Sequence, residues 1–160
     1  MPVIELTTLI HAPLERVFDL ARSIDLHSAS MARTGEQAVD GVTTGLIGAG
    51  QEVTWRARHF LVWQHLTSRI TAYERPRHLR DSQVRGAFAR FDHDHFFEPA
   101  GAGGTQTLMR DRFDFNSPLG PLGALVDRLV LTRYMRNFLL EHNRFLLETA
   151  EGSNWARYLP

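Results

Sequence analysis

The sequence predicts an α+β fold in which an antiparallel sheet is covered by one long C-terminal helix. Two observations predict it. Between residues 51 and 115, apolar and polar residues mostly alternate with a period of two, which is typical of strands with one solvated face. From residue 119 to about residue 149, apolar residues recur instead at helical spacing. An antiparallel sheet must bury its apolar face, and only this helix is long enough to cover it.

The first third of the chain is expected to contain one strand and one or two short helices. Residues 3–10 mix β-branched and apolar side chains, as strands do. Pro13 is followed by apolar residues at helical spacing, so a helix is expected to begin there. A short second helix is expected at about residues 25–31. The four glycines between residues 41 and 50 predict a loop.

Five more strands are expected, separated by Pro76 and by glycine-containing turns: 51–59, 64–73, 79–84, 88–98 and 105–115. Asn116-Ser117-Pro118 then offers a capping side chain ahead of a proline, so the long helix is expected to begin at residue 119. A helix that continues to residue 149 would be roughly 45 Å long, enough to cross a whole domain.

The composition of the 160 residues is typical of one globular domain, placed here at residues 1–150 with a tail at 151–160 that is expected to be loosely attached after Gly152. The 18 acidic and 18 basic side chains balance, so no overall field favours nucleic acid. The chain has no cysteine and no lysine, which excludes thiolate and Schiff-base chemistry. Arginines interrupt the apolar stretches and no leader-like segment opens the chain. We therefore expect no stable membrane insertion and a cytoplasmic location.

The arginines decide which face of the sheet points inward. If Trp55 faces the long helix, six strand arginines point to solvent, where charges cost little: Arg56, Arg58, Arg69, Arg90, Arg110 and Arg112. The opposite phase would bury all six charges. With Trp55 inward, the residues that share its face are expected to be Leu79, Asp81, Gln83, Phe91, His93, His95, Phe97, Met109, Asp111, Phe113 and Phe115.

This inward face predicts a small-molecule site, because apolar area gives affinity and a few polar groups give orientation. The expected ligand-binding residues are Trp55, His59, Asp81, Gln83, Phe91, His93, His95, Met109, Asp111, Phe113, Phe138 and His142. An unpaired buried carboxylate is costly. Asp81 and Asp111 are therefore expected to pair with His93, with His95 or with a ligand hydroxyl.

The histidine–aspartate group leaves three interpretations open. It could be a structural network that fixes strand register, or an acid–base pair with His93, His95 and Asp111 as the candidate catalytic residues. His93-x-His95 beside Asp111 could also hold zinc or iron, since alternate strand positions point the same way. No third ligand lies at a diagnostic spacing, so the sequence predicts no metal and no cofactor.

Several segments resemble one family. Residues 11–20, HAPLERVFDL, resemble the entry to the first helix of START-like proteins, also called SRPBCC. Residues 74–79 resemble that family's hairpin corner, residues 111–120 its passage into the last helix, and residues 83–95 a bacterial ligand-binding branch. The family includes the birch-pollen-allergen fold and polyketide cyclase/dehydratases. The resemblance, over residues 3–150, implies a helix-grip fold: seven antiparallel strands around the C-terminal helix, with a cavity between them.

The leading functional interpretation is a non-catalytic protein that carries, senses or sequesters a small hydrophobic or aromatic molecule. The first alternative is an enzyme similar to polyketide cyclase/dehydratases. In that enzyme His93 or His95, oriented by Asp111 or Asp81, would remove a proton α to a carbonyl. The second alternative is a regulatory interaction module with a vestigial cavity. The sequence does not specify a protein partner.

Overall fold

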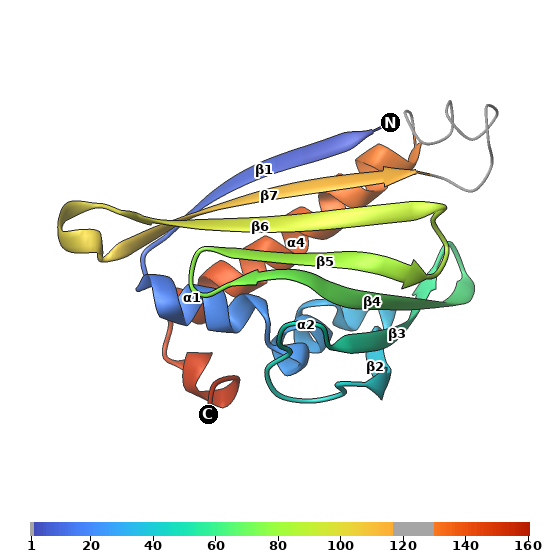
Figure 1. Cartoon of the computed structure of the whole chain (residues 1–160), viewed down its shortest axis with the longest axis horizontal. Coiled ribbons are helices and arrows are strands. Elements are labelled where there is room, and N and C mark those ends of the chain that lie inside the picture. Colours follow the sequence, from blue (N-terminus) through green and yellow to red (C-terminus); the bar gives the residue numbers. More distant parts are fainter. Residues whose placement is uncertain (1, 117–129) are drawn as a thin grey trace.

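A computed structural model describes residues 2–116 and 130–160, and its centre is one seven-stranded antiparallel sheet. The strand order is β1-β7-β6-β5-β4-β3-β2, so the first and last strands in sequence are neighbours (Figure 1). The strands are β1 (Val3–Ile10), β2 (Gln37–Gly41), β3 (Glu52–His59), β4 (Val62–Glu74), β5 (His78–Arg85), β6 (Arg90–Ala100) and β7 (Gln106–Asn116). The α-helices are α1 (Leu14–Ala21), α2 (Ile24–Ser30) and α4 (Thr132–Glu151).

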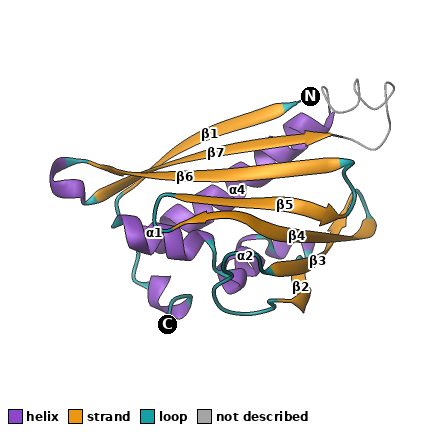
Figure 2. Cartoon of the chain, viewed as in Figure 1, coloured by secondary structure: helices purple, strands orange, loops and turns teal. Residues whose placement is uncertain are grey.

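The helix α4 runs diagonally behind the sheet, and α1 and α2 lie beside the lower strands in the same view (Figure 2). This arrangement confirms the predicted α+β helix-grip fold, with two short helices after the first strand. The predicted phase is also confirmed, because Trp55, Phe91 and Phe113 are buried while Arg56, Arg58 and Arg110 are exposed. Alternate residues of β7 are buried along its whole length, as one covered face requires.

The core consists of two apolar clusters with polar residues between them. The first cluster surrounds Phe18 of α1, whose ring packs edge-on against Phe97 at 5.3 Å. The second includes Phe91, Phe113 and Leu139. Fully burying one such side chain contributes roughly 1.5–3 kcal/mol to folding. The two clusters join the sheet to α4 at the two ends of the core.

A belt of buried polar residues crosses the structure between these clusters. On β6 the inward sequence is phenylalanine, histidine, histidine, phenylalanine; on β7 it is methionine, aspartate, phenylalanine, phenylalanine. On α4, buried apolar residues lie on both sides of a buried histidine–asparagine pair. The buried members of the belt are His93, His95, Asp111, His142 and Asn143. The apolar clusters hold this belt in place from two sides.

The structure differs from the predictions at β2, at β4 and at β6, which lies two residues later than expected. No element was predicted at residues 37–40, because β2 is short and mostly exposed and so has no apolar alternation to detect. It ends at Gly41, where φ is +74° and an added Cβ would lie 2.3 Å from the carbonyl oxygen of Glu52. The strand β4 begins at Val62 rather than at residue 64, because the β3–β4 hairpin turns tightly through Phe60 and Leu61, both with positive φ.

The C-terminal region confirms one prediction and corrects another. Twenty residues of the long helix are present as α4, whereas the predicted portion at 119–129 lies outside the described residues. The tail was expected to be loosely attached, but it packs against the core. The guanidinium of Arg16 lies 4.2 Å from the Trp155 ring centroid, and the Ser23 hydroxyl donates a hydrogen bond to the carbonyl of Tyr158.

The domain boundary at residue 150 stays a prediction. Among the described helices, none is long and apolar enough to cross a membrane.

Candidate functional site

A cavity of about 530 Å³ lies between the inner face of the sheet and the helices α2 and α4. This volume is within the roughly 300–1,000 Å³ typical of small-molecule sites. Apolar side chains from five strands and from α4 provide most of its wall, among them Trp55, Leu79, Phe91, Phe113 and Leu139. Polar side chains are fewer, and six of them are histidines. The fold therefore combines a mostly apolar cavity with a few oriented polar groups.

Most of the predicted ligand-binding residues line this cavity: Trp55, His59, Asp81, Phe91, His93, His95, Phe113, Phe138 and His142. Three others lie outside the lining. The Gln83 side chain is hydrogen-bonded at both ends to the backbone of Phe88, which explains its orientation. Met109 is fully buried in the first apolar cluster. Asp111 lies behind the two histidines of β6. The functional roles of all these residues remain predictions.

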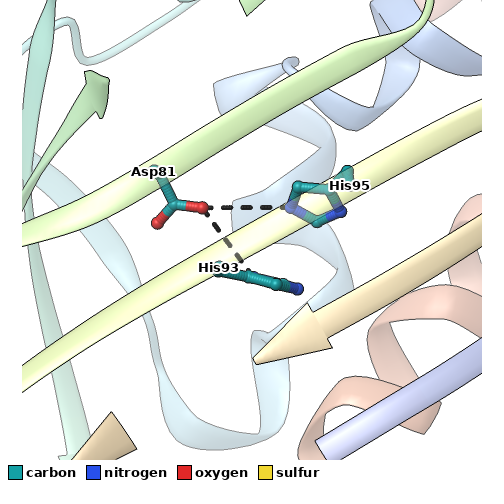
Figure 3. A group of neighbouring side chains, drawn as sticks. All are labelled: Asp81, His93 and His95. Atoms are coloured by element: carbon teal, nitrogen blue, oxygen red, sulfur yellow. Dashed lines mark ion pairs between the residues drawn. The ribbon is translucent and has the colours of Figure 1, made fainter. Parts of the chain in front are cut away.

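Two imidazoles of β6 lie between two carboxylates. Oδ1 of Asp111 is 2.7 Å from Nδ1 of His95 and 3.4 Å from Nε2 of His93. On the other side, Oδ1 of Asp81 is 3.8 Å from Nδ1 of His93 and 3.9 Å from Nε2 of His95 (Figure 3). The strand register causes this arrangement, because Asp81 pairs with His93 across β5–β6 and Asp111 pairs with His95 across β6–β7. The expected carboxylate–histidine pairing is therefore present.

The electrostatics of this group are dominated by Asp111. Burial by itself would raise the pKa of Asp111, but His93 and His95 outweigh burial and hold that pKa well below its usual range. Burial would likewise lower the pKa of His95, yet the adjacent Asp111 raises it. The other carboxylate oxygen of Asp111 accepts a 2.6 Å hydrogen bond from the side-chain amide of Asn143 on α4. Asp111 and His95 thus form a charged pair anchored from the helix.

A second group of histidines lines the cavity nearer to α2. The Ser30 hydroxyl donates its proton to the carbonyl of His27 at 2.7 Å, so its oxygen accepts from Nδ1 of His142 at 2.7 Å. Burial, followed by the nearby His27 and His95, lowers the pKa of His142 well below its usual value. Burial also lowers the pKa of His59, whose Nδ1 lies 2.7 Å from the Tyr134 hydroxyl. These two imidazoles are therefore neutral near pH 7.

Several polar residues of the cavity wall were not predicted as ligand-binding, among them His27, Glu36 and Tyr134. Nε2 of His27 lies 2.6 Å from Oε1 of Glu36. Tyr134 belongs to the predicted apolar stripe of the long helix, and that stripe was the signal that could have identified it. Glu36 lies just before β2, in a segment with no periodic pattern, so the sequence offered no signal for it.

One part of this wall has the donor atoms that a metal ion requires. Asp81, His93 and His95 each offer one ligand atom, and these atoms lie within 4.8 Å of one another. A carboxylate and two imidazoles suit divalent ions such as Zn²⁺ and Fe²⁺.

Solved structures similar to this chain confirm the fold. The protein TTHA0849 from Thermus thermophilus superposes with a TM-score of 0.74 at 19% identity, covering 93% of this chain and 97% of that one. A START superfamily protein from Mycobacterium smegmatis gives 0.69 at 11% identity, covering 92% and 97%. The ginseng major latex-like protein 151 from Panax ginseng gives 0.61 at 15% identity, covering 99% and 98%.

No protein of curated function matches the sequence significantly. A family model does match, and it covers residues 1–142, which include every strand and most of α4. Together with the helix-grip architecture, this match shows that the chain belongs to the START-like family described as polyketide cyclase / dehydrase and lipid transport.

Proposed function

We propose that this chain binds one small, largely apolar molecule in the cavity between the sheet and α4. The observation that carries the proposal is the cavity of about 530 Å³, which stays open between two tightly packed apolar clusters. A largely apolar pocket of this size is typical of a small-molecule site, and a ligand would gain dispersion contacts with its wall. The family description, with its polyketides and lipids, supports the same class of molecule.

The walls suggest how such a ligand would be oriented. Aromatic side chains such as Trp55, Phe91 and Phe138 would contact its apolar body. A carbonyl or hydroxyl on the ligand would face Asp81 and the histidines of β6. The ligand class is therefore an apolar or aromatic molecule with at least one oxygen substituent.

The entrance would lie between the β3–β4 hairpin and the beginning of α4. Phe60 at the hairpin tip and Val130 just before α4 both line the cavity, yet they are 58% and 53% exposed. The Phe60 ring lies 4.6 Å from the ring of Tyr134, so these two side chains close the space between hairpin and helix. Rotation of Phe60 alone would widen this opening.

The test is ligand binding by the wild-type chain and by a variant with a filled cavity. A panel of lipids, quinones and aromatic polyketides is screened by thermal shift, since a ligand at 100 times its Kd stabilises the fold by about 2.7 kcal/mol. Ala57 is buried and lines the cavity, so Ala57→Phe is expected to abolish the shift while the protein stays folded. Ala89→Phe, at an exposed position, is the matched control and should bind normally. Absence of any shift, together with a crystal structure whose side chains fill the cavity, would refute the proposal.

The cyclase/dehydratase interpretation stays a prediction with one observation in its favour. The rings of His93 and His95 line the cavity, and Asp111 lies behind them to orient an imidazole that accepts a proton. It predicts that His93→Ala abolishes turnover of a β-keto substrate without loss of fold. Unchanged turnover in that variant would exclude it. The expected cytoplasmic location likewise stays a prediction.

A further inference from the structure

We propose that Asp81, His93 and His95 form a binding site for one divalent metal ion of the zinc or ferrous type. The ion would be additional to the proposed apolar ligand, and its binding does not depend on that ligand. The three donors come from adjacent strands, and one oxygen of Asp81 lies next to both rings (Figure 3). Among the described residues, this is the only group of histidine and carboxylate ligand atoms clustered closely enough to hold an ion.

The distances suit an ion after a small adjustment. Donors bound at about 2.1 Å with angles between tetrahedral and octahedral values lie roughly 3.0–3.4 Å apart. Oδ1 of Asp81 is 3.8 and 3.9 Å from the two ring nitrogens, about half an ångström too far. The Asp81 carboxylate is 24% exposed, and within residues 2–116 and 130–160 its only ion pairs are with these two rings. A small rotation of this one side chain would shorten both of its distances to the rings, while the two ring nitrogens already lie within 4.8 Å of each other.

The opposite nitrogens of the two rings lie near the kind of partner that metal-bound histidines usually have. A histidine that binds a metal commonly donates its other N–H to a carboxylate, which fixes the tautomer and the ring orientation. Here Oδ1 of Asp111 lies 2.7 Å from Nδ1 of His95 and 3.4 Å from Nε2 of His93, although neither contact has hydrogen-bond geometry. Asn143 holds the other oxygen of Asp111. Nδ1 of His93 and Nε2 of His95 are the ring nitrogens nearer to Asp81.

Charge balance favours the same conclusion. Two carboxylates, Asp81 and Asp111, face a pair of imidazoles whose ring centroids are only 3.9 Å apart. A divalent cation placed between Asp81 and the two rings would be attracted by both carboxylates.

The position of the site leaves part of the ion open to the cavity. Asp81, His93 and His95 line the cavity, whereas Asp111 and Asn143 do not. Three protein ligands on one side are typical of zinc and ferrous sites that keep positions for water or for a ligand. The group that completes the coordination would be one or two oxygen atoms of the cavity ligand, as in a hydroxy-ketone or a carboxylate.

The test measures metal binding directly on the full chain. After chelator treatment, Co²⁺ and Zn²⁺ are titrated by calorimetry, and the Co²⁺ complex is followed by its visible spectrum. We expect one ion per chain and a Co²⁺ spectrum typical of mixed nitrogen and oxygen ligands. Asp81→Asn is expected to weaken binding at least about 100-fold, and Asn143→Ala, which acts through Asp111, about 10-fold.

Asp92→Asn is the matched control, because Asp92 lies on β6 beside His93 but binds Ser82 and Arg90 on the outer face. It should leave affinity within twofold. Anomalous diffraction from a Zn²⁺-soaked wild-type crystal locates the ion whether or not a variant folds. Absence of one-to-one binding, wild-type affinity in Asp81→Asn, or an anomalous peak away from these residues would each overturn the proposal. The apolar-ligand screen is run in chelator, so the two proposals can fail separately.

Discussion

His95 of β6 and His142 of α4 line the same cavity, yet their pKa values are shifted in opposite directions. His95 and His142 are both buried, at 7% and 5% exposure. The pKa of His95 is raised, because Asp111 outweighs the effect of burial, whereas burial lowers the pKa of His142. The two side chains are thus almost equally buried. The partner therefore decides the charge, and a carboxylate 2.7 Å away outweighs the loss of solvent.

The partner of His142 explains the second case. The one proton of Ser30 is donated to the carbonyl of His27, so Ser30 can only accept from His142. This bond holds a neutral imidazole in one tautomer and offers no negative charge to hold a second proton. The cavity therefore has one wall built around the Asp111–His95 group and one wall on which His59 and His142 are neutral near pH 7. A ligand with one polar end and one apolar end would distinguish them.

Removing the Asp111 carboxylate has the largest expected effect. Asp111→Ala leaves His95 without its anion and Asn143 without its acceptor, which is expected to lower the free energy of unfolding by about 3 kcal/mol. Urea denaturation near pH 6 measures it. The stability that the wild type gains from His95 is fully present below the unfolded histidine pKa of about 6.5. It is lost as pH rises through the raised pKa of His95 in the folded state. The difference in stability between wild type and Asp111→Ala should therefore shrink at higher pH.

Asp92→Ala is the control for this substitution, since it removes a carboxylate of the same strand pair from a more exposed ion pair with Arg90. It is expected to cost less than about 1 kcal/mol. Equal losses in the two variants would show that the Asp111 group does not differ from a surface pair, and the comparison of the two walls would no longer hold.

The sequence predicted the polar belt well and its partners less well. The alternation along β6 and β7, with arginines on the other face, was enough to place Asp81, His93, His95 and Asp111 together. The face that a strand residue occupies follows from local alternation, so it could be inferred, whereas the register that pairs Asp81 with His93 and Asp111 with His95 could not. The anchor Asn143 and the pairing of His142 with Ser30 depend on how helices pack onto the sheet, which periodicity does not specify. For the same reason Tyr134 was assigned to the apolar stripe and His27 to no site.

Replacing His142 has an intermediate expected effect and tests the neutral wall. Below an unfolded pKa of about 6.5 the unfolded chain binds a proton at His142, while the folded chain, with its lowered pKa, does not. Wild-type stability should therefore fall as pH decreases from 7 to 5. In His142→Leu this contribution disappears, so the stability curve should be flatter by up to about 1.4 kcal/mol per pH unit.

Ser30→Ala is the matched control for that measurement. It removes the hydrogen bond but keeps the buried imidazole, so it should lose about 1 kcal/mol at pH 8 and retain the steep pH dependence. If His142→Leu is as pH-dependent as the wild type, burial does not hold this ring neutral.

Tyr134→Phe has the smallest expected effect and separates burial from hydrogen bonding most directly. It removes the hydroxyl that lies 2.7 Å from Nδ1 of His59, at an expected cost of about 0.5–1 kcal/mol in the free energy of unfolding. The lowered pKa of His59 results from burial and not from Tyr134, so NMR titration should still find it below the usual histidine value in this variant. In Asp111→Asn, by contrast, the raised pKa of His95 should fall markedly, because its cause has been removed. A normal pKa for His59 in Tyr134→Phe would mean that hydrogen bonds set the charge on both walls, and burial would then explain neither.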